Sequence, residues 1–217
     1  VVEGGYLYDF HYPNQMDFKR AAQVAYHMML AHSLAVKRYR TLSLPGQIGI
    51  VLNLTPSYPR SSNPADLKAS FIADLFFNRA FLDPAVKGVY PQELIDILRE
   101  HDQMPVVQSG DCELLAAGKI DLLGINYYQP RRVKAKEQPC AGAPHTPEDL
   151  FDFYQMPGRK MNPHRGWEIY EQGIYDILVN LRDHYGNIPS YISENGMGVE
   201  GEARFKGEDG QIQDDYR

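Results

Sequence analysis

Tyr191-Ile192-Ser193-Glu194-Asn195-Gly196 places a carboxylate where an apolar run meets an Asn-Gly turn. The run is typical of a buried strand, which would fix Glu194 in space. Asn-Gly favours a tight turn, so the backbone swings away and leaves the carboxylate exposed in a pocket. The stretch therefore predicts a strand over residues 191–193 with a functional site at its carboxyl end. The alternative is a strand-terminal Glu in an ordinary hairpin turn.

Two earlier apolar runs, residues 48–52 and 120–125, also have the character of buried strands. Helical patterns alternate with the strands, over residues 17–40, from 64 to just before Asp83-Pro84, from 91, over 111–118 and over 170–184. This alternation predicts an α/β protein with a parallel sheet, either a (β/α)₈ barrel or an open doubly wound sheet. Both architectures place the site at the carboxyl ends of the strands.

The helix that begins at Pro64 is expected to turn four apolar side chains inward, those of Leu67, Phe71, Leu75 and Ala80. Residues 129–166 are predicted to be one long loop, and connections of that length are uncommon in compact domains unless they serve a site.

Polar side chains follow the two earlier strands. Asn53 comes directly after residues 48–52, and Asn126-Tyr127-Tyr128 follows residues 120–125. Strand alternation places Asn126 and Tyr128 on one face and Tyr127 on the other. A phenol beside a carboxylate can donate a hydrogen bond that keeps the carboxylate ionised and oriented. The alternatives are aromatic packing at a strand edge for the Tyr pair and a plain loop role for Asn53.

Four further residues have ordinary explanations as well as functional ones. Arg131, Arg132 and Lys134 could attract an anionic sugar, although a charged loop face is the more frequent role of such a cluster. Trp167, in Gly166-Trp167-Glu168, is interpreted as a packing residue.

Composition excludes several classes of function. The 217 residues are 43% hydrophobic and 23% charged, which is ordinary for one globular domain. The net charge of −6 gives no basic footprint for nucleic acid or an anionic membrane. No run approaches the roughly 20 apolar residues of a membrane helix. The two cysteines, Cys112 and Cys140, are expected to be free thiols in a reducing cytoplasm. With no metal-ligand spacing and no nucleotide-binding glycine motif, no metal or organic cofactor is expected.

Several segments together identify a resemblance to glycoside hydrolase family 1. They are Gly49 to Pro59, Phe77 to Pro84, Asp121 to Tyr128, Gly166 to Tyr170, and Tyr185-Gly186-Asn187 leading to Glu194-Asn195-Gly196. The resemblance implies a (β/α)₈ barrel, of which the three predicted strands are similar to the fifth, sixth and seventh. It also implies a retaining β-glycosidase in which Glu194 is the nucleophile and Tyr128 its hydrogen-bond partner. By the same resemblance, Asn126 lies close to the sugar and Asn53 faces the aglycone.

Within the family, Tyr58-Pro59-Arg60-Ser61 and Tyr128-Gln129-Pro130-Arg131-Arg132 are most similar to bacterial 6-phospho-β-glucosidases of the cytoplasm. The substrate implied is a small phosphorylated β-glycoside. An unphosphorylated β-glucoside, a 6-phospho-β-galactoside, and a non-catalytic sugar-binding role are the alternatives. The phosphate-binding Ser/Lys/Tyr loop of that group follows the eighth strand, beyond these residues.

The chain departs from the family in one important respect. The general acid/base Glu of the family lies in an Asn-Glu-Pro motif, and these 217 residues contain no such motif. We therefore expect a single, partial barrel domain over residues 1–217 that lacks the other strands and is inactive alone. Such a domain would have open sheet edges, which favour self-association.

Overall fold

A computed structural model describes residues 1–138 and 141–213. Its helices and strands, in chain order, are η1 (Glu3–Leu7), α1 (Phe18–Thr41), β1 (Gly49–Asn53), β2 (Ser57–Pro59), α2 (Pro64–Asp74), η2 (Leu75–Arg79), α3 (Ala80–Lys87), α4 (Gln92–Glu100), α5 (Asp111–Ala117), β3 (Leu122–Tyr127), β4 (Arg131–Ala135), η3 (Pro147–Leu150), β5 (Phe151–Phe153), β6 (Met161–Asn162), β7 (Trp167–Glu168), α6 (Gln172–His184), β8 (Ser190–Asn195) and η4 (Glu202–Phe205).

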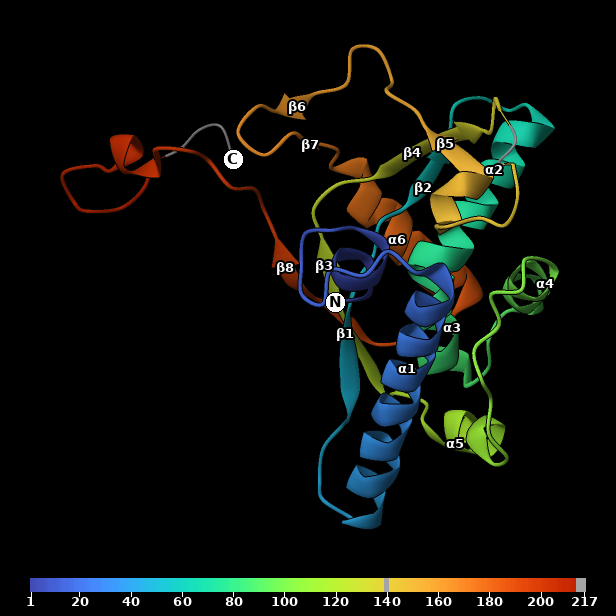
Figure 1. Ribbon diagram of the computed structural model, residues 1–217. Coiled ribbons are helices and arrows are strands. Elements are labelled where there is room, and N and C mark those ends of the chain that lie inside the picture. Colours follow the sequence, from blue (N-terminus) through green and yellow to red (C-terminus); the bar gives the residue numbers. More distant parts are fainter. Residues whose placement is uncertain (139–140, 214–217) are drawn as a thin grey trace.

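The three predicted strands form one parallel sheet in the order β1-β3-β8. Figure 1 shows these strands side by side, with α1 to α6 gathered on one side of them. Within the described residues the sheet has two free edges, β1 and β8, and does not close into a barrel. The predicted α/β class and partial barrel are therefore confirmed.

The main core lies between this sheet and its helices. Leu123 and Ile125 of the central strand are fully buried, and they pack with Met29 of α1, Leu82 of α3 and Leu181 of α6. The prediction of three buried strands is right for β3, holds in β1 only at Leu52, and is wrong for β8, where every residue is exposed. A strand at a sheet edge is covered on fewer sides, so an apolar run alone does not establish its burial.

The helix that begins at Pro64 differs from the prediction in the face that it buries. Leu67 and Phe71 are exposed, whereas Asp66 is almost completely buried. The Asp66 carboxylate accepts hydrogen bonds from the backbone N–H of Ala135 at 2.8 Å and from the hydroxyl of Ser61 at 2.7 Å. Satisfying a buried carboxylate in this way fixes the rotation of the helix and leaves Leu67 and Phe71 outside. Leu75 and Ala80, further along the same segment, are buried as predicted.

The same helical segment also continues past Asp83-Pro84, through η2 into α3, with Pro84 inside the helix. Asp83 is buried and accepts a hydrogen bond from the hydroxyl of Tyr185 at 2.5 Å. It also pairs with Arg79 at 3.2 Å and Lys87 at 3.5 Å, one turn before and one turn after it. These pairs hold the helical turns on both sides of Pro84. They compensate for the loss of the backbone hydrogen bond that proline cannot donate.

Residues 129–166 are not the long loop that the sequence predicts. They contain β4 and β5, which form a second sheet in the order β2-β4-β5, and β6, which pairs with β7 in a hairpin. The alternation in β4 places Val133 in a small apolar core with Phe77 and Phe151. The charged neighbours of Val133 obscure this alternation in the sequence, because Arg and Lys are infrequent in strands.

Candidate active site

Asn53, Asn126 and Glu194 lie at the same edge of the parallel sheet. Asn53 is the register partner of Asn126, and Asn126 is the register partner of Glu194. A bulge between β3 and β8 leaves Ser193 as the extra residue, and its hydroxyl donates to Asn126 Oδ1 at 2.7 Å. Bulges of this kind re-aim side chains, so the irregularity sets the direction of the carboxylate that follows it.

The hydroxyl of Tyr128 donates a hydrogen bond to Glu194 Oε2. This bond raises the pKa of the Tyr128 phenol, with a smaller contribution from partial burial. The phenol therefore keeps its proton at neutral pH and acts as a donor to the carboxylate. Beyond the pair, Gly196 has a φ of +125°, a backbone conformation that glycine adopts without strain.

Tyr127 points away from this pair, as strand alternation predicts. Its hydroxyl donates to the backbone oxygen of Tyr170 at 2.6 Å, close against Gly173 of α6. A Cβ added at Gly173 would lie 2.0 Å from the Tyr127 oxygen, so this side of the strand is closely packed structure. The two adjacent tyrosines thus have separate environments, one in the helix layer and one at the carboxylate.

Trp167 lies closer to the site than the packing interpretation implies. Its ring centroid is 5.4 Å from that of Tyr128, with the planes tilted by 46°. The guanidinium of Arg165 lies over the indole, 4.9 Å from its ring centroid. The indole is only half-buried, so it combines a packing contact with an accessible surface beside the phenol. Sequence reasoning missed this contact because the β6–β7 hairpin that carries Trp167 had no recognisable strand signal.

Each cation of the Arg131, Arg132 and Lys134 cluster has a carboxylate partner. Arg131 is nearly buried, lies 3.4 Å over the Phe77 ring and pairs with Glu3 at 3.4 Å. Arg132 pairs with Glu168 at 2.6 Å, and Lys134 pairs with Glu137 at 2.6 Å. These pairs favour a structural role for the cluster over attraction of an anionic sugar.

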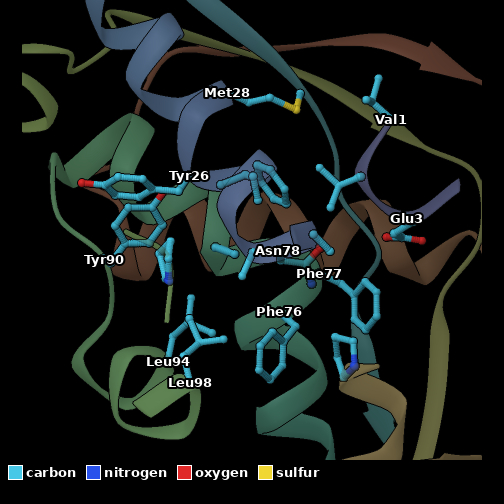
Figure 2. Close-up of a pocket in the computed structure, with 18 of the residues that line it drawn as sticks. Val1, Glu3, Tyr26, Met28, Phe76, Phe77, Asn78, Tyr90, Leu94 and Leu98 are labelled. Atoms are coloured by element: carbon cyan, nitrogen blue, oxygen red, sulfur yellow. The ribbon is translucent and has the colours of Figure 1, made fainter. Parts of the chain in front are cut away.

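A cavity of about 680 Å³ lies apart from the Tyr128–Glu194 pair. It is lined mostly by apolar side chains of η1, α1, β1, η2, α3 and α4, among them Tyr26, Phe76 and Leu94 (Figure 2). Asn53 lines this cavity, but Tyr128 and Glu194 do not. Asn53 therefore lies between the polar edge of the sheet and an apolar space.

Residues 1–138 and 141–213 contain neither a metal-binding cluster nor a membrane-spanning helix. In that part of the chain, no cluster of three His, Cys, Asp or Glu side chains could hold a metal ion. The helices there are too short or too polar to cross a membrane. Cys112 is a free, exposed thiol, and Cys140 lies outside the described residues.

The fold and the site define an α/β protein whose polar side chains gather at the carboxyl ends of parallel strands, with a carboxylate bonded to a phenol. Comparison with known proteins identifies the family. Residues 1–217 match Glycosyl hydrolase family 1, and the chain belongs to that family.

Relatives and solved structures agree with this assignment. The chain is 64% identical to the 6-phospho-beta-glucosidase GmuD of Bacillus subtilis, over all of this chain and 47% of that protein. It is 33% identical to a 6-phospho-beta-galactosidase of Clostridium acetobutylicum, over all of this chain and 48% of that protein. A family 1 β-glucosidase structure from Thermotoga maritima matches with a TM-score of 0.81 and 30% identity, over 100% of this chain and 45% of that one.

These findings confirm the predicted resemblance to family 1 and, within it, to bacterial 6-phospho-β-glucosidases. The chain spans about half the length of the curated relatives that it matches.

Proposed function

We propose that this chain is the part of a retaining β-glycosidase that carries the catalytic nucleophile, and that the whole enzyme hydrolyses 6-phospho-β-glucosides. The observation that carries the proposal is the hydrogen bond from Tyr128 to Glu194 at the carboxyl edge of the sheet. A nucleophilic carboxylate has to be ionised, oriented and accessible, and a phenol donor at a rigid strand end supports the first two requirements. Glu194 is exposed, which supports the third.

In this mechanism Glu194 attacks the anomeric carbon while an acid protonates the leaving oxygen, and the C–O bond to the aglycone breaks. Water then attacks the glycosyl-enzyme ester, assisted by the same acid/base residue, and releases the sugar with its original stereochemistry. Tyr128 holds the carboxylate of Glu194 in line, and Asn126 and Asn53 contact the sugar and the aglycone side. No metal or organic cofactor takes part.

The second carboxylate is the group that this chain does not supply. A retaining mechanism places its two carboxyl groups about 5–5.5 Å apart. The family carries the acid/base residue in an Asn-Glu-Pro motif, which is absent from these 217 residues. We therefore propose that residues 1–217, a single domain around one main core, are catalytically incomplete.

The phosphorylated substrate is supported by the 64% identity to a protein named as a 6-phospho-beta-glucosidase. The 33% identity to a 6-phospho-beta-galactosidase and the match to β-glucosidase structures keep those two substrates as alternatives. A cytoplasmic location is part of the same proposal, since a doubly charged sugar phosphate does not cross a membrane unaided.

The test compares the 217-residue chain with a chimera in which it replaces the matching segment of the Bacillus subtilis relative. With chromogenic 6-phospho-β-glucoside, the chimera should turn over and the chain alone should be slower by at least 10²–10⁴-fold, the usual contribution of a general acid. Parallel assays with the plain β-glucoside and the 6-phospho-β-galactoside rank the alternatives. Equal hydrolysis by the isolated chain would contradict the proposal, and a chimera that binds but never cleaves would favour a sugar-binding role.

We further propose that the isolated chain self-associates through the free edges of β1 and β8. Their backbone groups are available for pairing, and Val51, Tyr191 and Ile192 are about half exposed on these strands. Light scattering should show a mass that increases with protein concentration. Ile192→Lys should restore the monomer, because a charged side chain on an edge strand opposes pairing. Leu178→Lys, a comparable change at an exposed side chain of α6, is the control, and a monomeric wild type would contradict the proposal.

A further inference from the structure

The β6–β7 hairpin lies beside the candidate site and is anchored to it on one side by an ion pair. Arg132 of β4 and Glu168 of β7 are almost completely buried. Arg132 Nε donates to the two Glu168 oxygens at 3.0 and 2.9 Å, and a terminal nitrogen donates at 2.6 Å. A guanidinium that engages both oxygens fixes orientation as well as distance, which a lysine in the same place would not do.

Two more contacts strengthen this anchor. The guanidinium of Arg132 lies 4.7 Å over the ring of Tyr170, which follows β7 closely. The backbone N–H of Glu168 donates to Gln129 Oε1 at 3.2 Å, and Gln129 is the residue next to Tyr128. The hairpin is thus bound directly to the segment that carries the phenol.

A second anchor joins the hairpin to the segment that follows the carboxylate. Asn162 of β6 is fully buried. Its amide nitrogen donates to the backbone oxygen of Gly198 at 2.9 Å, and its Oδ1 accepts from the backbone N–H of His164 at 2.9 Å. Gly198 lies four residues after Glu194, so this contact fixes the path of the chain as it leaves the carboxylate.

Trp167 lies between the two anchors. In the hairpin it is the register partner of Asn162, and it directly precedes Glu168. Its ring rests against Tyr128, the donor to Glu194. A shift of either anchor would therefore move the indole and remove its contact with the Tyr128 ring.

We propose that Arg132 and Asn162 are positioning residues, which act through the β6–β7 hairpin to hold Trp167 against Tyr128 and so fix the phenol that orients Glu194. The catalytic part of this inference rests on the proposed function. The structural part does not, because it concerns only where the indole lies.

Trp167 is the only tryptophan of the chain, so its fluorescence reports on the hairpin directly. In the 217-residue chain, Arg132→Gln should raise the acrylamide quenching constant of Trp167 roughly twofold and shift its emission to the red, because the freed hairpin opens locally. Arg132→Lys keeps the positive charge but loses the guanidinium that engages both oxygens of Glu168. It should give an intermediate quenching constant. Lys134→Gln removes a half-exposed pair from the same strand and is the matched control, with no change expected.

Arg132→Gln leaves Glu168 buried without its partner and could unfold the chain, so circular dichroism accompanies each measurement. Asn162→Ala removes the hydrogen bonds of the other anchor without leaving a buried charge unpaired. It should also increase the acrylamide quenching constant of Trp167. Wild-type quenching in folded Asn162→Ala and Arg132→Lys proteins would overturn the proposal.

The catalytic part is measured in the chimera. Arg132→Lys should lower kcat about tenfold with little change in KM, since the phenol is misplaced in the transition state and ground-state binding is retained. Increased quenching with unchanged kcat would overturn the positioning role, even if Glu194 is the nucleophile. Conversely, an active Glu194→Gln chimera would contradict the proposed function. It would not affect the conclusion that the two anchors hold Trp167 in place.

Discussion

Glu194→Gln in the chimera is expected to reduce kcat/KM for a 6-phospho-β-glucoside by on the order of 10⁴-fold or more, the scale seen when a covalent nucleophile is removed. The amide has almost the same shape as the carboxylate and can still accept the hydrogen bond from Tyr128. It cannot form the glycosyl ester. The variant should therefore bind substrate and unfold at nearly the same temperature as the parent, because the residue is exposed. Steady-state kinetics and thermal unfolding measure the two effects separately.

Glu200→Gln is the matched control for this change. Glu200 is an exposed carboxylate six residues further along the same segment, and its replacement should leave turnover within a few-fold of the parent. Rapid quenching followed by mass spectrometry adds a direct readout, since only enzymes with Glu194 should carry a sugar on the peptide that contains residue 194. Turnover by Glu194→Gln close to that of the control would refute the nucleophile assignment.

The parts of this fold that the sequence predicted correctly depend on local patterns. The helix predicted over residues 17–40 is α1, Phe18–Thr41, because an uninterrupted apolar stripe and the Asp17 cap are both local signals. The three parallel strands were recognisable by their short apolar runs between helices. Their order in the sheet, with β3 in the centre, places Asn126 beside Glu194 and explains why polar residues far apart in sequence share one edge.

The parts that it predicted wrongly depend on partners distant in sequence. Asp66 has the nearby Ser61 as one partner, but its burial also depends on the backbone N–H of Ala135, 69 residues away, and the sequence around Asp66 does not indicate this second partner. Arg132 was interpreted as part of a charged loop face because its partner Glu168 lies 36 residues further on. The β6–β7 hairpin has only two residues in each strand, too few for an alternating pattern. Consequently the carboxylate and phenol could be predicted, whereas the Trp167 contact and the anchors around it could not.

Tyr128→Phe is expected to lower kcat/KM in the chimera by roughly 10- to 150-fold, which corresponds to the loss of a hydrogen bond to a charged group worth about 1.5–3 kcal/mol. The pKa of the Tyr128 phenol is raised by its bond to Glu194, so the phenol remains protonated and donates across the neutral range. Without this donor the carboxylate of Glu194 loses the partner that orients it for attack, so the loss should appear in kcat with little change in KM.

Tyr127→Phe separates this effect from a general loss of packing. Tyr127 is the adjacent phenol on the opposite face, buried, with its hydroxyl bonded to the backbone oxygen of Tyr170. Its loss should cost about 1 kcal/mol of folding stability and leave kcat within a few-fold of the parent. A comparable loss of kcat in both variants would mean that loosening β3 is sufficient to disturb Glu194. A loss in neither would mean that the Tyr128–Glu194 bond holds the strand ends together without orienting the carboxylate for attack. Only a loss confined to Tyr128→Phe assigns the orientation of Glu194 to the phenol beside it.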